Sequence, residues 1–334
     1  MRGIQGRRTP ADCHRIGGTP PAALLPERPA MEGRPLAAQS GWLMLIFGGL
    51  FFVIACVLGG YLWHGGHLLL LYQPAEFLII AGAGVGILVA GTPMGVLKEL
   101  VHQGKRLLTP PPGRKAYTDL LVMLYQLFRV VQATGVMALE PHLDDPKQSA
   151  ILSKYPNFLR RHSSMAFLAD SARVIIVGGI SPHDFDALMY EDLEVRQRES
   201  LGPTHTLQKV GDAMPALGIV AAVLGVIVTM QAIDGPPSEI GHKVGVALVG
   251  TFLGILLAYG FFQPIATAME HRVEEELQVE HVIKAGILAV HKGFAPAIAV
   301  EFARRVIPEE VRPSFDETEK LCRSARSDAA AAAA

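Results

Sequence analysis

The most constraining feature of this sequence is a pair of long segments that lack Asp, Glu, Lys and Arg and are joined by a short Gly/Pro turn. They cover residues 213–233 and 244–269, and a helix needs roughly 20 residues to cross a hydrocarbon layer. Pro215 and Pro264 lie near the ends far from the turn, and small residues recur at Gly218, Gly225, Gly250 and Gly254. We therefore predict a transmembrane hairpin of two closely packed helices.

Composition supports a membrane protein, because 50% of the residues are hydrophobic and 18% are charged. Two further charge-poor windows, at 41–63 and 77–97, predict two more spans. Lys and Arg cluster after the second window and before the third, which places both termini and the long middle segment in the cytoplasm. The predicted fold is all-α and polytopic, with four transmembrane helices and a helical cytoplasmic domain between the second and third.

Five regions follow from this pattern. Residues 1–40 form a basic extension without apolar periodicity, which predicts disorder. Spans one and two occupy 41–97, the cytoplasmic domain 98–208, and spans three and four 209–269; a cytoplasmic helix and a loose tail occupy 270–334. The first span is too long for a signal peptide and lacks a clear cleavage site. A translation start at Met44 remains an alternative to the extension.

The middle segment has helical periodicity. Apolar spacing predicts helices over 117–139 and 164–177. A third helix is predicted to start with Ser181 as its N-cap and Pro182 at its first helical position.

Motifs for enzymatic chemistry are missing. The sequence has no P-loop, no Gly-x-Ser-x-Gly and no zinc-ligand spacing, and its three cysteines are scattered. A formal net charge of −1 gives no reason to expect a nucleic-acid partner. We predict a protein that is not an enzyme and has no cofactor or bound metal.

No predicted span carries an ionisable residue at its middle. Proteins that move ions usually keep such a residue inside the membrane, so this chain is either inert to ions or takes the titrating group from a partner. Glu76 and Asp212 lie at span ends and are interpreted as interface residues. Thr251, near the centre of the fourth span, either faces an ion route or bonds back to its own helix.

Five strings between Met44 and about Lys320 are distinctive: YQPAEFLIIAGAGVG, GDAMPALGIVAAVLGV, GTFLGILLAYGF, FAPAIAVEFARR and RPSF. Through them the sequence resembles the MotA family of flagellar motor stator subunits. The resemblance implies a homo-oligomer, a pentamer around a dimer of MotB, in the lipid of the bacterial inner membrane. MotB would supply the ion-binding aspartate, and ion flow would drive torque on the rotor protein FliG.

The resemblance also implies roles for single residues. Pro215 and Pro264 match the family's two functional prolines, and Thr251 matches a threonine near its ion path. Sodium-driven members resemble one another in having a threonine where this chain has Ala222; the loss of an oxygen ligand favours protons.

At the rotor interface, Glu140 matches an acidic residue of the family. The basic partner position falls on Gln132, which departs from the family pattern. Arg129 lies three residues earlier on the same helix face, and we hypothesise that it supplies the positive charge.

Two other functions compete with the stator. One is a proton-driven energiser of the ExbB/TolQ type, although those proteins typically have three spans. The other is a passive membrane scaffold, for which the two prolines would have no functional role.

Overall fold

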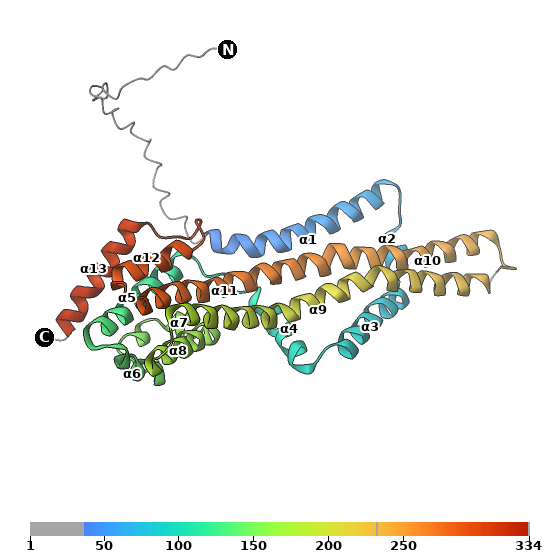
Figure 1. The fold of residues 1–334 in the computed structure, drawn as a ribbon. Helices are drawn as coiled ribbons and strands as arrows, with labels where there is room; N and C mark the ends of the chain where they lie inside the picture. The colour runs from blue at the N-terminus through green and yellow to red at the C-terminus, as the bar shows by residue number, and fades with distance from the viewer. Residues whose placement is uncertain (1–36, 232, 333–334) are drawn as a thin grey trace, which may run out of the picture. The chain divides into compact units, whose positions relative to one another are not determined.

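The computed structural model describes residues 37–231 and 233–332, and every regular element in these ranges is a helix (Figure 1). The extension predicted at 1–40 lies almost wholly outside the described residues. Four helices are long and apolar enough to cross a membrane, as the sequence predicted. The N-terminal elements are α1 (Ala37–Trp63), α2 (Leu68–Leu71), α3 (Pro74–Gly91) and α4 (Met94–Arg106).

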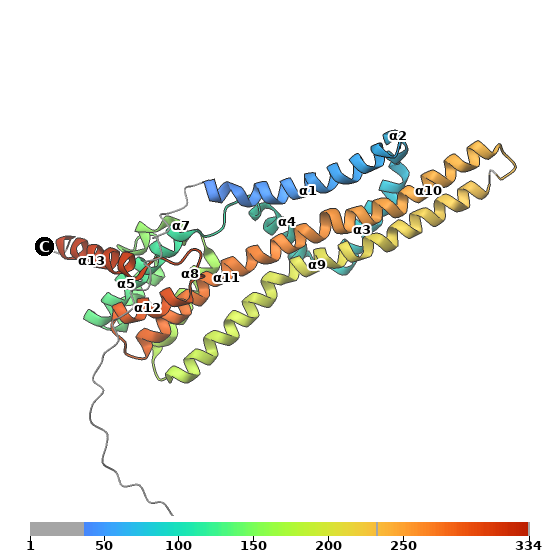
Figure 2. The same ribbon diagram turned by 90° about the horizontal axis from the view of Figure 1, so that it is seen from above.

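Two long antiparallel helical segments form the centre of the described chain. The first is α9 (Pro182–Met230); the second consists of α10 (Pro237–Leu257), a π-helical turn η3 (Ala258–Phe262) and α11 (Gln263–His291). They run side by side in both views (Figures 1 and 2). We call α9 from Val210 onward, together with α10 and η3, the hairpin.

The start of α9 follows the sequence prediction. Ser181 is the N-cap, its Oγ accepts a hydrogen bond from the backbone N–H of Asp184 at 3.2 Å, and Pro182 occupies the first turn, where its missing N–H costs nothing. The helix then continues without interruption for 49 residues. The boundary predicted at 208/209 therefore falls inside one helix, so the polar domain and the membrane span share it.

The polar domain is built around α5 (Arg114–Thr134), α8 (His162–Val177) and α12 (Pro296–Val306), which pack with α9 and α11. Short elements complete it: η1 (Val136–Leu139), α6 (Glu140–Asp144), η2 (Leu152–Lys154) and α7 (Pro156–Leu159). Its fully buried side chains include Leu121, Leu124, Phe167, Phe185 and Ile283. Apolar side chains of α9 and α11 thus belong to this core.

The helix predicted over 117–139 ends earlier, at Thr134. Gly135 follows with φ +89°, a conformation that side chains disfavour, and its N–H bonds to Val131 O. The chain then continues as the 3₁₀ turn η1. Apolar periodicity runs through both elements, which is why the pattern alone did not reveal the break.

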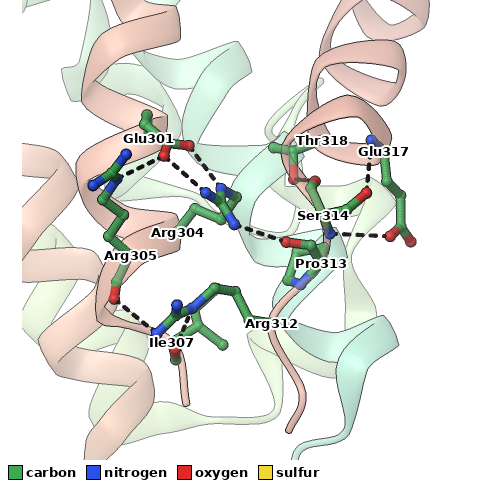
Figure 3. Close-up of polar contacts among 9 residues, drawn as sticks. All are labelled: Glu301, Arg304, Arg305, Ile307, Arg312, Pro313, Ser314, Glu317 and Thr318. Carbon is green, nitrogen blue, oxygen red and sulfur yellow. Dashed lines mark hydrogen bonds and ion pairs between the residues drawn. The ribbon is translucent and has the colours of Figure 1, made fainter. Parts of the chain in front are cut away.

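The loose tail predicted at the C-terminus is instead a helix, α13 (Phe315–Ala332). Its start is a capping box (Figure 3). Ser314 Oγ accepts from the N–H of Glu317 at 3.2 Å, and the N–H of Ser314 donates to Glu317 Oε2 at 3.4 Å. Glu317 also pairs with Arg114 of α5, which attaches α13 to the polar domain.

Arginines connect α12 to this cap (Figure 3). Arg304 donates Nε and Nη2 to the two oxygens of Glu301 at 2.7 and 2.8 Å, and its Nη1 donates to Pro313 O at 3.0 Å. Arg312 donates to Ile307 O at 2.8 Å and to Arg305 O at 3.2 Å. The strings FAPAIAVEFARR and RPSF thus form one hydrogen-bonded junction.

This junction predicts a pH-dependent contribution to stability. The hydrogen bonds from Arg304 hold the pKa of Glu301 below its usual range. A lowered folded-state pKa stabilises the fold above the unfolded value, and that contribution is lost as pH falls through the folded value. In thermal unfolding we expect Glu301→Gln to cost about 1–2 kcal/mol at pH 7. The difference should shrink below about pH 5; a difference independent of pH would contradict this.

Candidate functional site

The hairpin helices touch backbone to backbone at a crossing made by glycines. A Cβ built on Gly218 would lie 2.8 Å from Gly250 O and 3.1 Å from Gly254 Cα. One built on Gly254 would lie 2.6 Å from Met214 O. Side chains at these positions would push the helices apart, so the small residues noted in the sequence set the interhelical distance.

Ala222 and Thr251 lie at this crossing. Ala222 N is 3.2 Å from a Cβ built on Gly250, and Thr251 Cα is 3.3 Å from one built on Gly218. Both residues are half-buried. The structure therefore brings together two residues that the sequence predicted for an ion path.

The hydroxyl of Thr251 makes no hydrogen bond to any other described residue, including those of its own helix. Bonding back to the helix is seen elsewhere in the hairpin, where Thr229 Oγ1 donates to Gly225 O at 2.8 Å. In this conformation Thr251 does not do so. Its hydroxyl is available to a group from outside the chain.

The two predicted prolines lie on facing turns of α9 and the start of α11. Pro215 is half-buried inside α9, and Pro264 is exposed at the start of α11. The turns are joined because Gln263 Nε2 donates to Asp212 Oδ1 at 2.6 Å. Asp212, which the sequence placed at an interface, thus connects the two helices beside both prolines.

The π turn η3 accommodates Pro264 in the helix. Proline cannot donate to the carbonyl four residues earlier, and its ring clashes with that oxygen, here Gly260 O. The chain widens just before the proline, so that Gln263 N–H bonds to Ala258 O, five residues back. At Pro215 the surrounding α9 stays α-helical.

Glu76 is a residue whose environment the sequence did not reveal. It lies in the first turn of α3, inside the second candidate span, and is only 5% exposed. Its Oε2 is 2.7 Å from a Cβ built on Gly250, and its Oε1 is 3.5 Å from one built on Gly225. The carboxyl group therefore occupies space that two glycines of the hairpin leave open.

The carboxyl group of Glu76 has no hydrogen-bond partner within the described residues, and Oε2 is fully buried. An unsatisfied buried polar group costs about 1–3 kcal/mol. We therefore expect Glu76→Leu, which removes this group at similar size, to unfold at a temperature equal to or above that of the original chain. Glu76→Gln is the matched control that keeps a polar group. A lower unfolding temperature for the Leu variant alone would mean that the carboxyl group is satisfied in the membrane.

The residues predicted for the rotor interface lie in the polar domain, apart from the crossing. Arg129 is on α5, with Gln132 one turn later, and Glu140 opens α6. Gln132 and Glu140 are exposed and Arg129 is half-buried. Neither Arg129 nor Glu140 forms an ion pair with a described residue. Their charged groups are free to meet a partner.

Two family models match the sequence. The model described as Motility protein A N-terminal covers residues 47–135, and the MotA/TolQ/ExbB proton channel family covers 158–281. Motility protein A of Salmonella typhimurium is 40% identical over 284 residues, which are 85% of this chain and 96% of that protein. Chemotaxis protein LafT of Vibrio parahaemolyticus is 37% identical over 82% of this chain and 96% of its own.

Solved structures share the fold. The MotAB structure of C. jejuni matches with a TM-score of 0.64 and 18% identity, covering 81% of this chain and 98% of that one. The flagellar MotAB stator complex of Bacillus subtilis matches with a TM-score of 0.60 and 22% identity, covering 80% and 96%. The four spans and the polar domain between the second and third follow the same architecture.

Proposed function

The chain belongs to the motility protein A (MotA) family, and we propose that it is the ion-path subunit of a flagellar stator. Together with MotB it would form a proton-conducting, torque-generating complex in the bacterial inner membrane, with both termini in the cytoplasm. Five copies would surround two copies of MotB, and the polar domain would act on the rotor protein FliG. The relatives' names and the titles of the MotAB structures support this assignment.

The long continuous helices support the proposal that torque passes from the membrane spans to the polar domain. At 1.5 Å per residue, the 49 residues of α9 extend over about 74 Å. One end contains Ala222 at the crossing, and the other contributes Phe185 and Met189 to the core of the polar domain. A rotation of the hairpin would therefore be transmitted to the polar domain through a helix without a hinge loop.

The proposal that the ion is a proton is supported by the side chains at the helix crossing. The unpartnered hydroxyl of Thr251 can meet an ion or a carboxylate supplied by MotB. Ala222 contributes only a methyl group, so the pair lacks the several oxygen ligands that sodium prefers, and protons are the proposed ion. Each elementary charge that crosses the membrane provides about 2.3 kcal/mol per 100 mV. Torque then needs no covalent chemistry in this chain.

A strain that carries this stator alone tests the function. Swimming speed should be independent of sodium concentration and should fall to zero with a protonophore. Swimming that persists with the proton gradient collapsed and sodium present would contradict the proton assignment. A passive scaffold predicts that a deletion leaves swimming intact and that Pro215→Leu swims normally.

The rotor contact gives a separate prediction. If Arg129 supplies the positive charge missing at Gln132, Arg129→Glu should abolish swimming, and reversing the facing rotor acid should restore it, because opposite charges face each other again. Arg198→Glu is the control, since Arg198 is exposed and pairs only within its own helix. Failure of the reversed pair to swim would rule out this charge pairing, and normal swimming of Arg129→Glu alone would show that Arg129 is an ordinary surface residue.

A further inference from the structure

A cavity of about 690 Å³ lies where α4, the loop before α5, the start of α8 and α11 meet. Five arginine and lysine residues line it: Arg106, Lys115, Arg160, Arg161 and Arg272. Neither the ion path nor the rotor contact uses this cavity. Its volume can hold a phosphate-bearing headgroup.

Two of these arginines are held in place by the chain itself. Arg272 is 7% exposed; its Nη2 donates to Pro110 O at 3.0 Å and its Nε lies 3.3 Å from Glu276. Arg106 donates to the other oxygen of Glu276 at 2.9 Å. Glu276 is therefore shared between two guanidinium groups. The Nε and Nη1 of Arg272 remain without a well-oriented hydrogen bond, and the nearest oxygen to Nη1 in an ion pair is Glu275 Oε2 at 3.7 Å.

The guanidinium group of Arg161 makes no hydrogen bond or ion pair with any described residue. Burial lowers the pKa of its guanidinium, and the nearby charges of Arg272 and Arg106 lower it further, whereas Glu276 acts in the opposite direction. An arginine stays charged in proteins nonetheless. A half-buried cation beside two others, with no anion of its own, is an unfavourable arrangement that a bound anion would relieve.

The acidic residues that line the cavity do not serve as an anion for Arg161. Glu276 is engaged by Arg106 and Arg272, and Glu280 accepts from Ser163 Oγ at 2.7 Å. Asp119 interacts with Lys115, and Glu99 lines the cavity from α4 without an ion pair to a described residue. A site with free guanidinium groups and acidic neighbours suits a phosphate that also carries hydroxyl or amino groups.

The position of the cavity relative to the span points to the source of the phosphate. Arg272 comes three residues after Met269, where the charge-free segment ends, which places it on the order of 5 Å beyond the apolar part of the helix. The headgroup layer occupies roughly 5–8 Å on each side of the hydrocarbon. The backbone of Arg272 is therefore at the depth at which lipid phosphates are expected.

We propose that this cavity binds a phosphate group between Arg161 and Arg272, and that a membrane phospholipid supplies it. Arg161 and Arg272 would each donate to the phosphate oxygens, and Glu280 or Asp119 would receive the hydroxyl or amino groups of the headgroup. Free phosphate would bind to the same arginines. The inference does not depend on the flagellar function.

Two experiments with the full chain, purified in detergent with its co-purifying subunits, separate the sources. Native mass spectrometry after titration with phosphatidylglycerol counts bound lipid, and calorimetry with inorganic phosphate measures the free anion. We expect Arg161→Gln to weaken binding about tenfold or more, because a charged hydrogen bond is lost. Arg198→Gln, which changes an exposed arginine outside the cavity, should bind like the original chain.

Each outcome decides the proposal. Lipid binding that depends on Arg161 supports the phospholipid, and binding of inorganic phosphate alone supports the site with a soluble ligand. Should Arg161→Gln fail to fold, Arg161→Lys retains the charge without the planar fork and should bind with intermediate affinity. The proposal is overturned if the original chain binds neither probe, or if it binds them as weakly as the Arg161 variants.

Discussion

Pro264→Ala is expected to stop swimming while leaving the protein in the membrane. Alanine restores the N–H that can donate to Gly260 O, which favours a regular α-helix in place of the π turn η3. A π turn contains one residue more than an α turn. If it rewound as an α-helix, α11 would rotate by about 100° and shift by about 1.5 Å relative to α10. Val279 and Ile283 of α11 are buried in the polar domain. The coupling between hairpin and polar domain would therefore lose its register.

Cysteine labelling can detect this rotation in a chain whose native cysteines are replaced by serine. Ala266 is 0% exposed, so Ala266→Cys should react slowly with a maleimide and several-fold faster when combined with Pro264→Ala. Pro237→Ala is the matched control, because Pro237 occupies the first turn of α10, where no N–H is needed. Normal swimming of the Pro264 variant, with unchanged labelling, would show that the π turn persists without its proline.

Much of this hairpin could be predicted from the sequence because membrane spans are governed by local composition. Charge exclusion located the four spans, and the Ser181–Pro182 pair located the start of α9. The π turn was not predictable, since Pro264 is equally compatible with a kink or a helix end. Its form depends on α10 and α11 both being fixed by packing on either side.

The environment of Glu76 and the helical conformation of α13 were also not predicted from the sequence. Glu76 lies at the end of a charge-free window, which favours an interface position. Its carboxyl group lies in space left open by Gly225 and Gly250, which are far away in the sequence. Ser314 and Glu317 have capping-box spacing, but the polar sequence of the tail did not indicate the helix that they start. The roles of Glu140, Gln132 and Arg129 remain predictions, since they concern a partner surface.

Gly254→Ala should produce the largest loss of stability in the hairpin. Its Cβ would lie 2.6 Å from Met214 O and 2.8 Å from Gly218 Cα. Both are backbone atoms, which cannot rotate away as a flexible side chain can. The two helices must therefore separate, and overpacking of this kind costs about 1–3 kcal/mol. Thr251 and Ala222 would move apart with them, so swimming should be lost as well.

Gly82→Ala is the matched control, because a Cβ at Gly82 in α3 meets nothing within 4 Å. Alanine also has a higher helix propensity than glycine by about 1 kcal/mol, so this variant should be at least as stable as the original chain. Thermal unfolding in detergent measures the stability of both variants, and swimming in soft agar measures their function. If Gly254→Ala unfolds and swims like Gly82→Ala, the helices at the crossing are farther apart in the assembled complex than in this structure. The hydroxyl of Thr251 would then lie away from Ala222, and the proposed ion path would lose its geometric support.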